Sequence, residues 1–164
     1  MRVVADTGPI HYLVLIGEIE LLPCLFGRVV IPMAVRAELD RPATPPAVRT
    51  WIGAPPPWFS VQSEASPIDA TLPAGLDDGE RAAIALVLAN RAALLLMDDR
   101  AGVAAARAAG IRVTGTLGIL DRAARGGLVN LPAAFAALRA TSFHATTTLM
   151  EAILRDHRVR AGRR

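Results

Sequence analysis

Short apolar runs rich in Val, Ile and Leu recur along this 164-residue chain, and segments with the apolar spacing of amphipathic helices separate them. Strands that alternate with helices predict a parallel sheet, because each parallel connection crosses the sheet through a helix. The expected fold class is therefore α/β, a three-layer α/β/α sandwich with a central parallel sheet. Strands are expected at residues 3–5, 29–31, 59–61, 94–97 and 111–114.

Helix boundaries are indicated by capping residues, by proline in first turns and by glycine after last turns. Asp77 and Glu80 have the spacing of a capping box. Residues 41–57 hold six prolines and are expected to form a loop with one helical turn near 47–51. Helices are expected at 7–17, 18–26, from Pro32 through Leu39, 77–90, 100–109, 116–125, 132–140 and 146–156.

The length of the chain suits one domain, and the 52% hydrophobic content allows a sizeable core. We expect residues 1–140 to form the main domain, and 141–164 to form a C-terminal helix and basic tail of that same domain. Cys24 is the only cysteine, which excludes an intramolecular disulfide, fits a cytoplasmic location and is expected to lie in the core. No apolar run approaches roughly 18 residues, so a membrane span is not expected.

The chain has no lysine, since all 18 basic residues are arginine. This composition argues against a P-loop nucleotide-binding protein, which needs a lysine on the phosphates. It also argues against an enzyme that forms a Schiff base. No GxGxxG motif follows the first strand, which argues against a dinucleotide-binding fold.

Acidic residues stand at the ends of the expected elements. Asp6 follows the first expected strand, and Asp98 and Asp99 follow the expected strand at 94–97, which has the clearest strand pattern of the chain. Glu38 lies about two turns into the helix after the second strand, and Glu80 lies in the first turn of its helix. Because sites in parallel sheets form outside the carboxyl ends of the strands, we expect these acids to converge.

Convergent carboxylates repel one another unless a cation lies between them. A ligand set made only of oxygen atoms suits Mg²⁺ or Mn²⁺, and such ions can activate water for phosphodiester cleavage. Each acid also has a structural alternative. Asp6, Asp98 or Asp99 could cap a helix, Glu38 could be a solvated helix residue, and Glu80 could serve only the capping box.

Four segments resemble the motifs of the PIN-domain family, in particular its VapC-like toxin ribonucleases. They are VVADTGPIHYLVLIGEIELL, VVIPMAVRAEL, LDDGERAAIALVLA and LLLMDDRAG, and IRVTGTLGILDRAARGGLV resembles the sheet-closing strand and the helix after it. The resemblance covers roughly residues 2–140. It implies that Asp6, Glu38, Glu80 and Asp99 are catalytic metal ligands and that Asp98 is an accessory ligand or supports one. The loop residue Asp69 is expected to matter least.

The resemblance implies an endoribonuclease that depends on Mg²⁺ or Mn²⁺, often a toxin held by an antitoxin and often a homodimer. The helices from Ile10 to Phe26 carry more Leu and Ile than one buried stripe requires, which predicts a homodimer or antitoxin contact there. The alternative is a non-catalytic PIN module that binds RNA or a protein partner. An aspartate-nucleophile phosphohydrolase is disfavoured, because Gly8 stands where its second aspartate is needed.

Overall fold

The computed structural model describes residues 1–63 and 71–163. The chain forms two compact units, Met1–Thr116 and Leu117–Arg164, each with its own internal packing. The expected division at residue 140 stays a prediction.

The first unit is built on a five-stranded sheet in the order β3-β2-β1-β4-β5, and every neighbouring pair is parallel. Both central strands, β1 and β4, are buried along their whole length, which explains their continuous apolar sequences. The parallel α/β fold is therefore confirmed. The strands are β1 (Val3–Ala5), β2 (Val29–Pro32), β3 (Phe59–Gln62), β4 (Leu94–Leu96) and β5 (Val113–Thr114).

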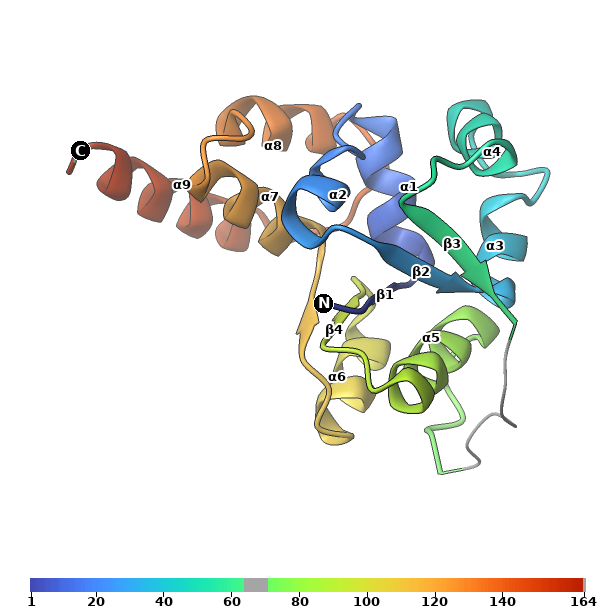
Figure 1. The fold of residues 1–164 in the computed structure, drawn as a ribbon. Helices are drawn as coiled ribbons and strands as arrows, with labels where there is room; N and C mark the ends of the chain where they lie inside the picture. Colours follow the sequence, from blue (N-terminus) through green and yellow to red (C-terminus); the bar gives the residue numbers. More distant parts are fainter. Residues whose placement is uncertain (64–70, 164) are drawn as a thin grey trace. The chain divides into compact units, whose positions relative to one another are not determined.

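Helices cover both faces of this sheet. Figure 1 shows α1, α2 and α4 on one side and α5 and α6 on the other. The chain builds outward from β1 to β2 and β3, then returns through α5 to β4 on the opposite side of β1. The helices of this unit are α1 (Thr7–Leu15), α2 (Leu21–Phe26), α3 (Met33–Leu39), α4 (Pro46–Gly53), α5 (Asp78–Asn90) and α6 (Arg100–Ala108).

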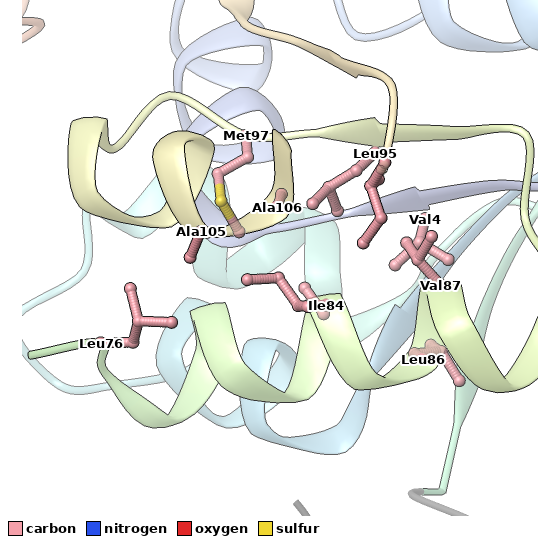
Figure 2. Packing of buried hydrophobic residues seen from close by; sticks show 11 residues of the cluster. Val4, Leu76, Ile84, Leu86, Val87, Leu95, Met97, Ala105 and Ala106 are labelled. Carbon is pink, nitrogen blue, oxygen red and sulfur yellow. The ribbon is translucent and has the colours of Figure 1, made fainter. Parts of the chain in front are cut away.

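The core beneath the sheet fixes α5 and α6 in place. Ile84 and Val87 of α5 and Ala106 of α6 belong to one buried cluster with Val4 of β1 and Leu95 of β4 (Figure 2). On the other helices, a second set of side chains is fully buried where α1, α3 and α4 pack against one another. It includes Ile10, Leu13, Val35, Leu39, Val48 and Ile52.

The second unit contains α7 (Thr116–Arg125, whose first residue belongs to the first unit), α8 (Leu131–Arg139) and α9 (Thr147–Ala161). Ion pairs join α7 to α9: Arg160 bonds to Asp121 at 2.6 Å and to Asp156 at 2.6 Å, and Arg125 also bonds to Asp121. Arg160 of the basic tail therefore serves the packing of this unit. No helix within the described residues is long and apolar enough to cross a membrane.

Several local expectations were wrong. The helical turn expected near 47–51 is present but is longer, forming the eight-residue helix α4, because Pro46 stands at a first-turn position where its missing N–H costs no hydrogen bond. Helix α2 begins at Leu21 instead of Glu18, and Cys24 on it is exposed. Helix α9 continues to Ala161, five residues beyond the expected end.

The apolar residues of α1, α2 and their connection divide into two groups. Leu13, Ile19, Leu21 and Leu22 are buried in the core of their own chain. Three of the Leu and Ile residues singled out for a partner contact are partly exposed, and the surface available to a partner here is thus smaller than the sequence indicates. They are Leu15, Ile16 and Leu25.

Candidate functional site

The acidic residues gather where the order of the strands reverses, between β1 and β4. Strands β1 and β4 are neighbours, with Ala5 opposite Leu96, so Asp6 and Asp98 follow adjacent strand ends. The backbone N–H of Asp6 donates to the Leu96 carbonyl at 2.8 Å and extends the ladder to this edge. The connections leave β1 and β4 in opposite directions along the sheet, which is the arrangement that opens a crevice for ligands.

Asp6 is buried at this edge with only 6% of its surface exposed. It precedes α1 as its N-cap residue, yet its side chain makes no capping hydrogen bond. Among the described residues, its Oδ1 atom is a buried side-chain atom without a hydrogen-bond partner. A purely structural cap does not account for this carboxylate, since buried polar atoms are normally paired.

Burial raises the pKa of Asp6 to about 7. The hydrogen bond from the Thr7 backbone lowers it, and the charges of Asp77, Glu38 and Glu80 raise it further. Four acids therefore interact electrostatically at this edge. A bound cation would reverse the penalty for the ionised form.

Glu38 extends from α3 toward the first turns of α1 and α5. Its Oε1 accepts a hydrogen bond from the Gly79 N–H at 3.2 Å, and its Oε2 accepts one from the Thr7 hydroxyl. The exposed Arg41 guanidinium lies 4.0 Å from Oε1. Its carboxylate thus links three of the four resembling motifs, so Glu38 is not a freely solvated helix residue.

Glu80 combines the two roles that the sequence left open. It completes a capping box with Asp77: the Glu80 N–H donates to Asp77 Oδ1 at 2.7 Å, and the Asp77 N–H donates to Glu80 Oε2 at 3.0 Å. Burial raises the pKa of Glu80 to about 7, the bond from Asp77 lowers it, and the charges of Asp77 and Asp99 raise it. The capping residue therefore also belongs to the acidic cluster.

Asp98 and Asp99 point in different directions. Asp98 accepts hydrogen bonds from the Thr116 N–H at 2.7 Å and the Thr116 hydroxyl at 2.6 Å. Burial raises the pKa of Asp98, and these two bonds lower it. Asp99 is exposed, caps α6 through the Gly102 N–H at 3.1 Å, and interacts with Glu80. Asp69 lies outside the described residues.

Asp77 is the site residue that sequence reasoning missed. It was interpreted only as the N-cap of α5, but its charge raises the pKa of both Asp6 and Glu80. The signal was present in LDDGE, where an acid stands three residues before Glu80. A carboxylate in a capping box is easily overlooked as a site residue, because the helix cap alone is enough reason for an acid at that position.

The donor chemistry suits a hard divalent cation, because the cluster offers carboxylate oxygens and one of them, Asp6 Oδ1, is buried and unpaired among the described residues. Asp6, Glu38, Glu80 and Asp99 could hold such an ion. Within the described part of the chain, no group of three or more Asp, Glu, His or Cys side chains is already arranged to hold one. Glu38 and Glu80 are directed instead at the N–H groups of Gly79 and Asp77.

A family model described as a PIN domain (DUF3368) matches residues 2–158. The chain belongs to the PIN-domain family. PIN domains are generally metal-dependent nucleases, which agrees with an acidic cluster at the carboxyl edge of the sheet.

A solved PIN-like structure supports the fold assignment. It is a PilT N-terminus domain protein, SSO1118, from the hyperthermophilic archaeon Sulfolobus solfataricus P2. The match has a TM-score of 0.52 at 15% sequence identity and covers 88% of this chain and 100% of that one. At this identity the likeness concerns the fold alone. No curated protein matches the sequence significantly.

Proposed function

We propose that this PIN domain is an endoribonuclease that depends on Mg²⁺ or Mn²⁺. One observation carries the proposal: Asp6 is buried among interacting acids at the carboxyl edge of the sheet, with Oδ1 lacking a hydrogen-bond partner among the described residues. A carboxylate placed in this way is costly in the metal-free protein and useful as a ligand. A module that only binds RNA or protein gives no reason to keep a buried carboxylate that lacks a hydrogen-bond partner among the described residues and lowers the stability of the folded protein.

The residues of the site have two roles: some would hold the ion, and others orient the side chains that hold it. Asp6, Glu38, Glu80 and Asp99 would bind the ion. When bound, it would activate a water molecule and stabilise the leaving oxygen of the phosphodiester. Thr7 and the Gly79 N–H orient Glu38, while Asp98 fixes Thr116 beside the site.

The proposed substrate is RNA, and Arg41 is well placed to contact its backbone. Its side chain is 67% exposed and lies 4.0 Å from Glu38. An arginine at this distance can pair with a phosphate next to the scissile bond. The net charge of +3 is consistent with a polyanionic substrate.

We further propose that the protein is the toxin of a toxin–antitoxin pair, acts in the cytoplasm and forms a homodimer. The support is the resemblance of its motifs to VapC-like proteins and the partly exposed Leu15, Ile16 and Leu25 around α1 and α2. Induced expression should arrest growth, and co-expression of a cognate antitoxin should relieve the arrest. Growth at the normal rate, with active protein present, would argue against the toxin role.

The experiment that tests the nuclease proposal is incubation of the purified protein with a mixed RNA pool in Mg²⁺, Mn²⁺ or EDTA. We expect internal cleavage with either metal and none with EDTA. The Glu38→Gln protein, purified in the same way, controls for contaminating nucleases. RNA binding without cleavage under all three conditions would favour the non-catalytic module instead.

A further inference from the structure

Gly79 occupies a position where a glycine is unusual. It is the second residue of α5, it is buried, and its φ is not in the left-handed region. Alanine suits such a helical position better, because glycine loses more backbone entropy on folding. The reason for a glycine therefore lies outside the backbone of α5.

The side chain of Glu38 fills the space next to Gly79. A methyl carbon added at Gly79 would lie 2.7 Å from both Oε1 and Oε2 of Glu38 and 2.8 Å from its Cδ. These separations are too short for non-bonded atoms, so an alanine here would displace the Glu38 carboxylate. The same carboxylate accepts the Gly79 N–H, which gains from the positive end of the α5 dipole.

Other glycines of the first unit lie beside an acid in the same way. A methyl carbon at Gly115 would lie 2.6 Å from Asp98 Oδ1, and one at Gly8 would lie 2.9 Å from Asp98 Oδ2. At Gly53 and Gly75, in contrast, the added carbon would meet no atom within 4 Å. At Gly8, Gly79 and Gly115, therefore, a side chain would collide with a carboxylate, whereas at Gly53 and Gly75 it would not.

We propose that Gly79 is a positioning residue that keeps the Glu38 carboxylate at the first turn of α5, between the Gly79 N–H and the Thr7 hydroxyl. This inference rests on the proposed function for its effect on activity. The placement of Glu38 itself does not depend on catalysis. Any larger residue at position 79 turns Glu38 away from Thr7 and from the neighbouring acids.

The first test is Gly79→Ala, with Gly53→Ala in α4 as the matched control. We expect Gly79→Ala to fold, because the Glu38 side chain is flexible and alanine favours the helix. Its Mn²⁺ affinity, measured by titration calorimetry, should fall roughly 10- to 100-fold, the usual loss when a ligand is no longer oriented. Its cleavage rate should fall with it. Gly53→Ala should leave both values unchanged.

A second test removes the steric conflict. Glu38→Asp shortens the acid, so it should do less harm in the Gly79→Ala background than in the wild-type background. Should Gly79→Ala fail to fold, the double variant Gly79→Ala, Glu38→Ala must restore folding. If that double variant also fails to fold, Gly79 serves the helix alone and the inference is wrong.

A metal-free crystal structure of Gly79→Ala separates this inference from the proposed function. We expect Glu38 to lie beyond hydrogen-bond distance of Thr7 in that structure. If Glu38 keeps its place, or if the variant binds Mn²⁺ as tightly as the wild type does, the inference is overturned. If the wild type neither binds Mn²⁺ nor cuts RNA, the proposed function fails, and the position of Glu38 still decides the inference.

Discussion

Asp98 and Asp99, the adjacent acids that follow β4, have different partners. The strand ends at Leu96, which lets Asp98 turn toward Thr116 while Asp99 turns toward Gly102 and Glu80. Successive residues of an extended strand would point to opposite faces, so the end of the strand is what brings both near one edge. Asp98 therefore holds Thr116 in place, and Asp99 is the acid of the pair that we propose as an ion ligand.

We predict that Asp98→Ala reduces stability, whereas Asp99→Asn mainly reduces cleavage. Thr116 is completely buried, and loss of Asp98 leaves its N–H and hydroxyl without this acceptor, which costs about 2–3 kcal/mol. Urea denaturation gives the first quantity, and initial cleavage rates at saturating Mn²⁺ give the second.

The isosteric pair Asp98→Asn and Asp99→Asn assigns the ligand. We expect Asp99→Asn to be the slower enzyme, with the exposed Asp40→Asn, near 56% side-chain exposure, as the control. An inactive Asp98→Asn beside an active Asp99→Asn would show that the first acid is the principal one.

Among the helices of the first unit, α5 contributes to the site in several ways. Its first turn supplies the capping box, the N–H that binds Glu38, and Glu80 itself. The N-terminus of a helix favours negative charge, so it stabilises a group of carboxylates that would otherwise repel one another. The start of α5 therefore determines both where the Glu38 and Glu80 carboxylates lie and how well their negative charges are stabilised.

We predict that Glu80→Gln preserves stability and removes the response to metal. Glutamine at the third helical position still accepts the Asp77 N–H, but it has no charge to repel Asp77 and Asp99. At pH 8 without metal, its melting temperature should equal or exceed that of the wild type. The rise in melting temperature on adding Mn²⁺ should shrink.

Asp77→Ala provides the contrast for Glu80→Gln. It removes the cap on the Glu80 N–H and should cost about 1 kcal/mol, or about 2–4 °C in melting temperature. Differential scanning calorimetry compares the two variants directly. A loss in Glu80→Gln as large as that in Asp77→Ala would mean that the Glu80 charge stabilises the metal-free protein, which contradicts the repulsion from Asp77 and Asp99.

The sequence predicted the strands better than the bounds of the helices. Continuous apolar runs such as 94–97 are unambiguous, because a strand buried on both faces tolerates few polar residues. The prolines obscured the length of α4, of which only one turn near 47–51 was expected, since prolines are common both in loops and in the first turn of a helix. Helix ends were inaccurate where no capping residue marks them, as at Glu20 before α2.

The site was predictable residue by residue but not as a network. Asp6 and Glu38 could be assigned from their positions after strands and from the family motifs. The partner of Glu38 could not, because Gly79 is 41 residues away in sequence and a glycine gives no signal of what lies beside it. Asp77 was missed because its capping role explained it without a ligand.

For the whole molecule, the acidic cluster makes stability depend on pH. The pKa of Asp6 is raised from 3.8 to about 7 in the folded protein. Below about pH 4 the carboxyl is protonated in both the folded and the unfolded state. Between about pH 4 and 7 the unfolded state ionises first, so the free energy of unfolding falls as the pH rises, and above this range it levels off.

We predict that the metal-free protein loses up to roughly 4 kcal/mol of stability through this group between pH 4 and 7. Asp6→Asn has no ionisable group there and should lose less, so its stability should exceed that of the wild type by a margin that grows with pH. Urea titrations in EDTA at several pH values measure both curves. Parallel curves for the two proteins would show that Asp6 ionises normally.

In the proposed function, Asp6 and the acids around it bind a divalent ion, and the protein uses that ion to cut RNA. The most direct measurement is the initial rate of RNA cleavage by wild type, Asp6→Asn and Asp40→Asn, over a series of Mn²⁺ concentrations. We predict a saturable dependence on Mn²⁺ in wild type and Asp40→Asn, and a loss of at least about 100-fold in a folded Asp6→Asn protein. Cleavage by Asp6→Asn at the wild-type rate, or a wild-type rate that is unchanged in EDTA, would contradict it.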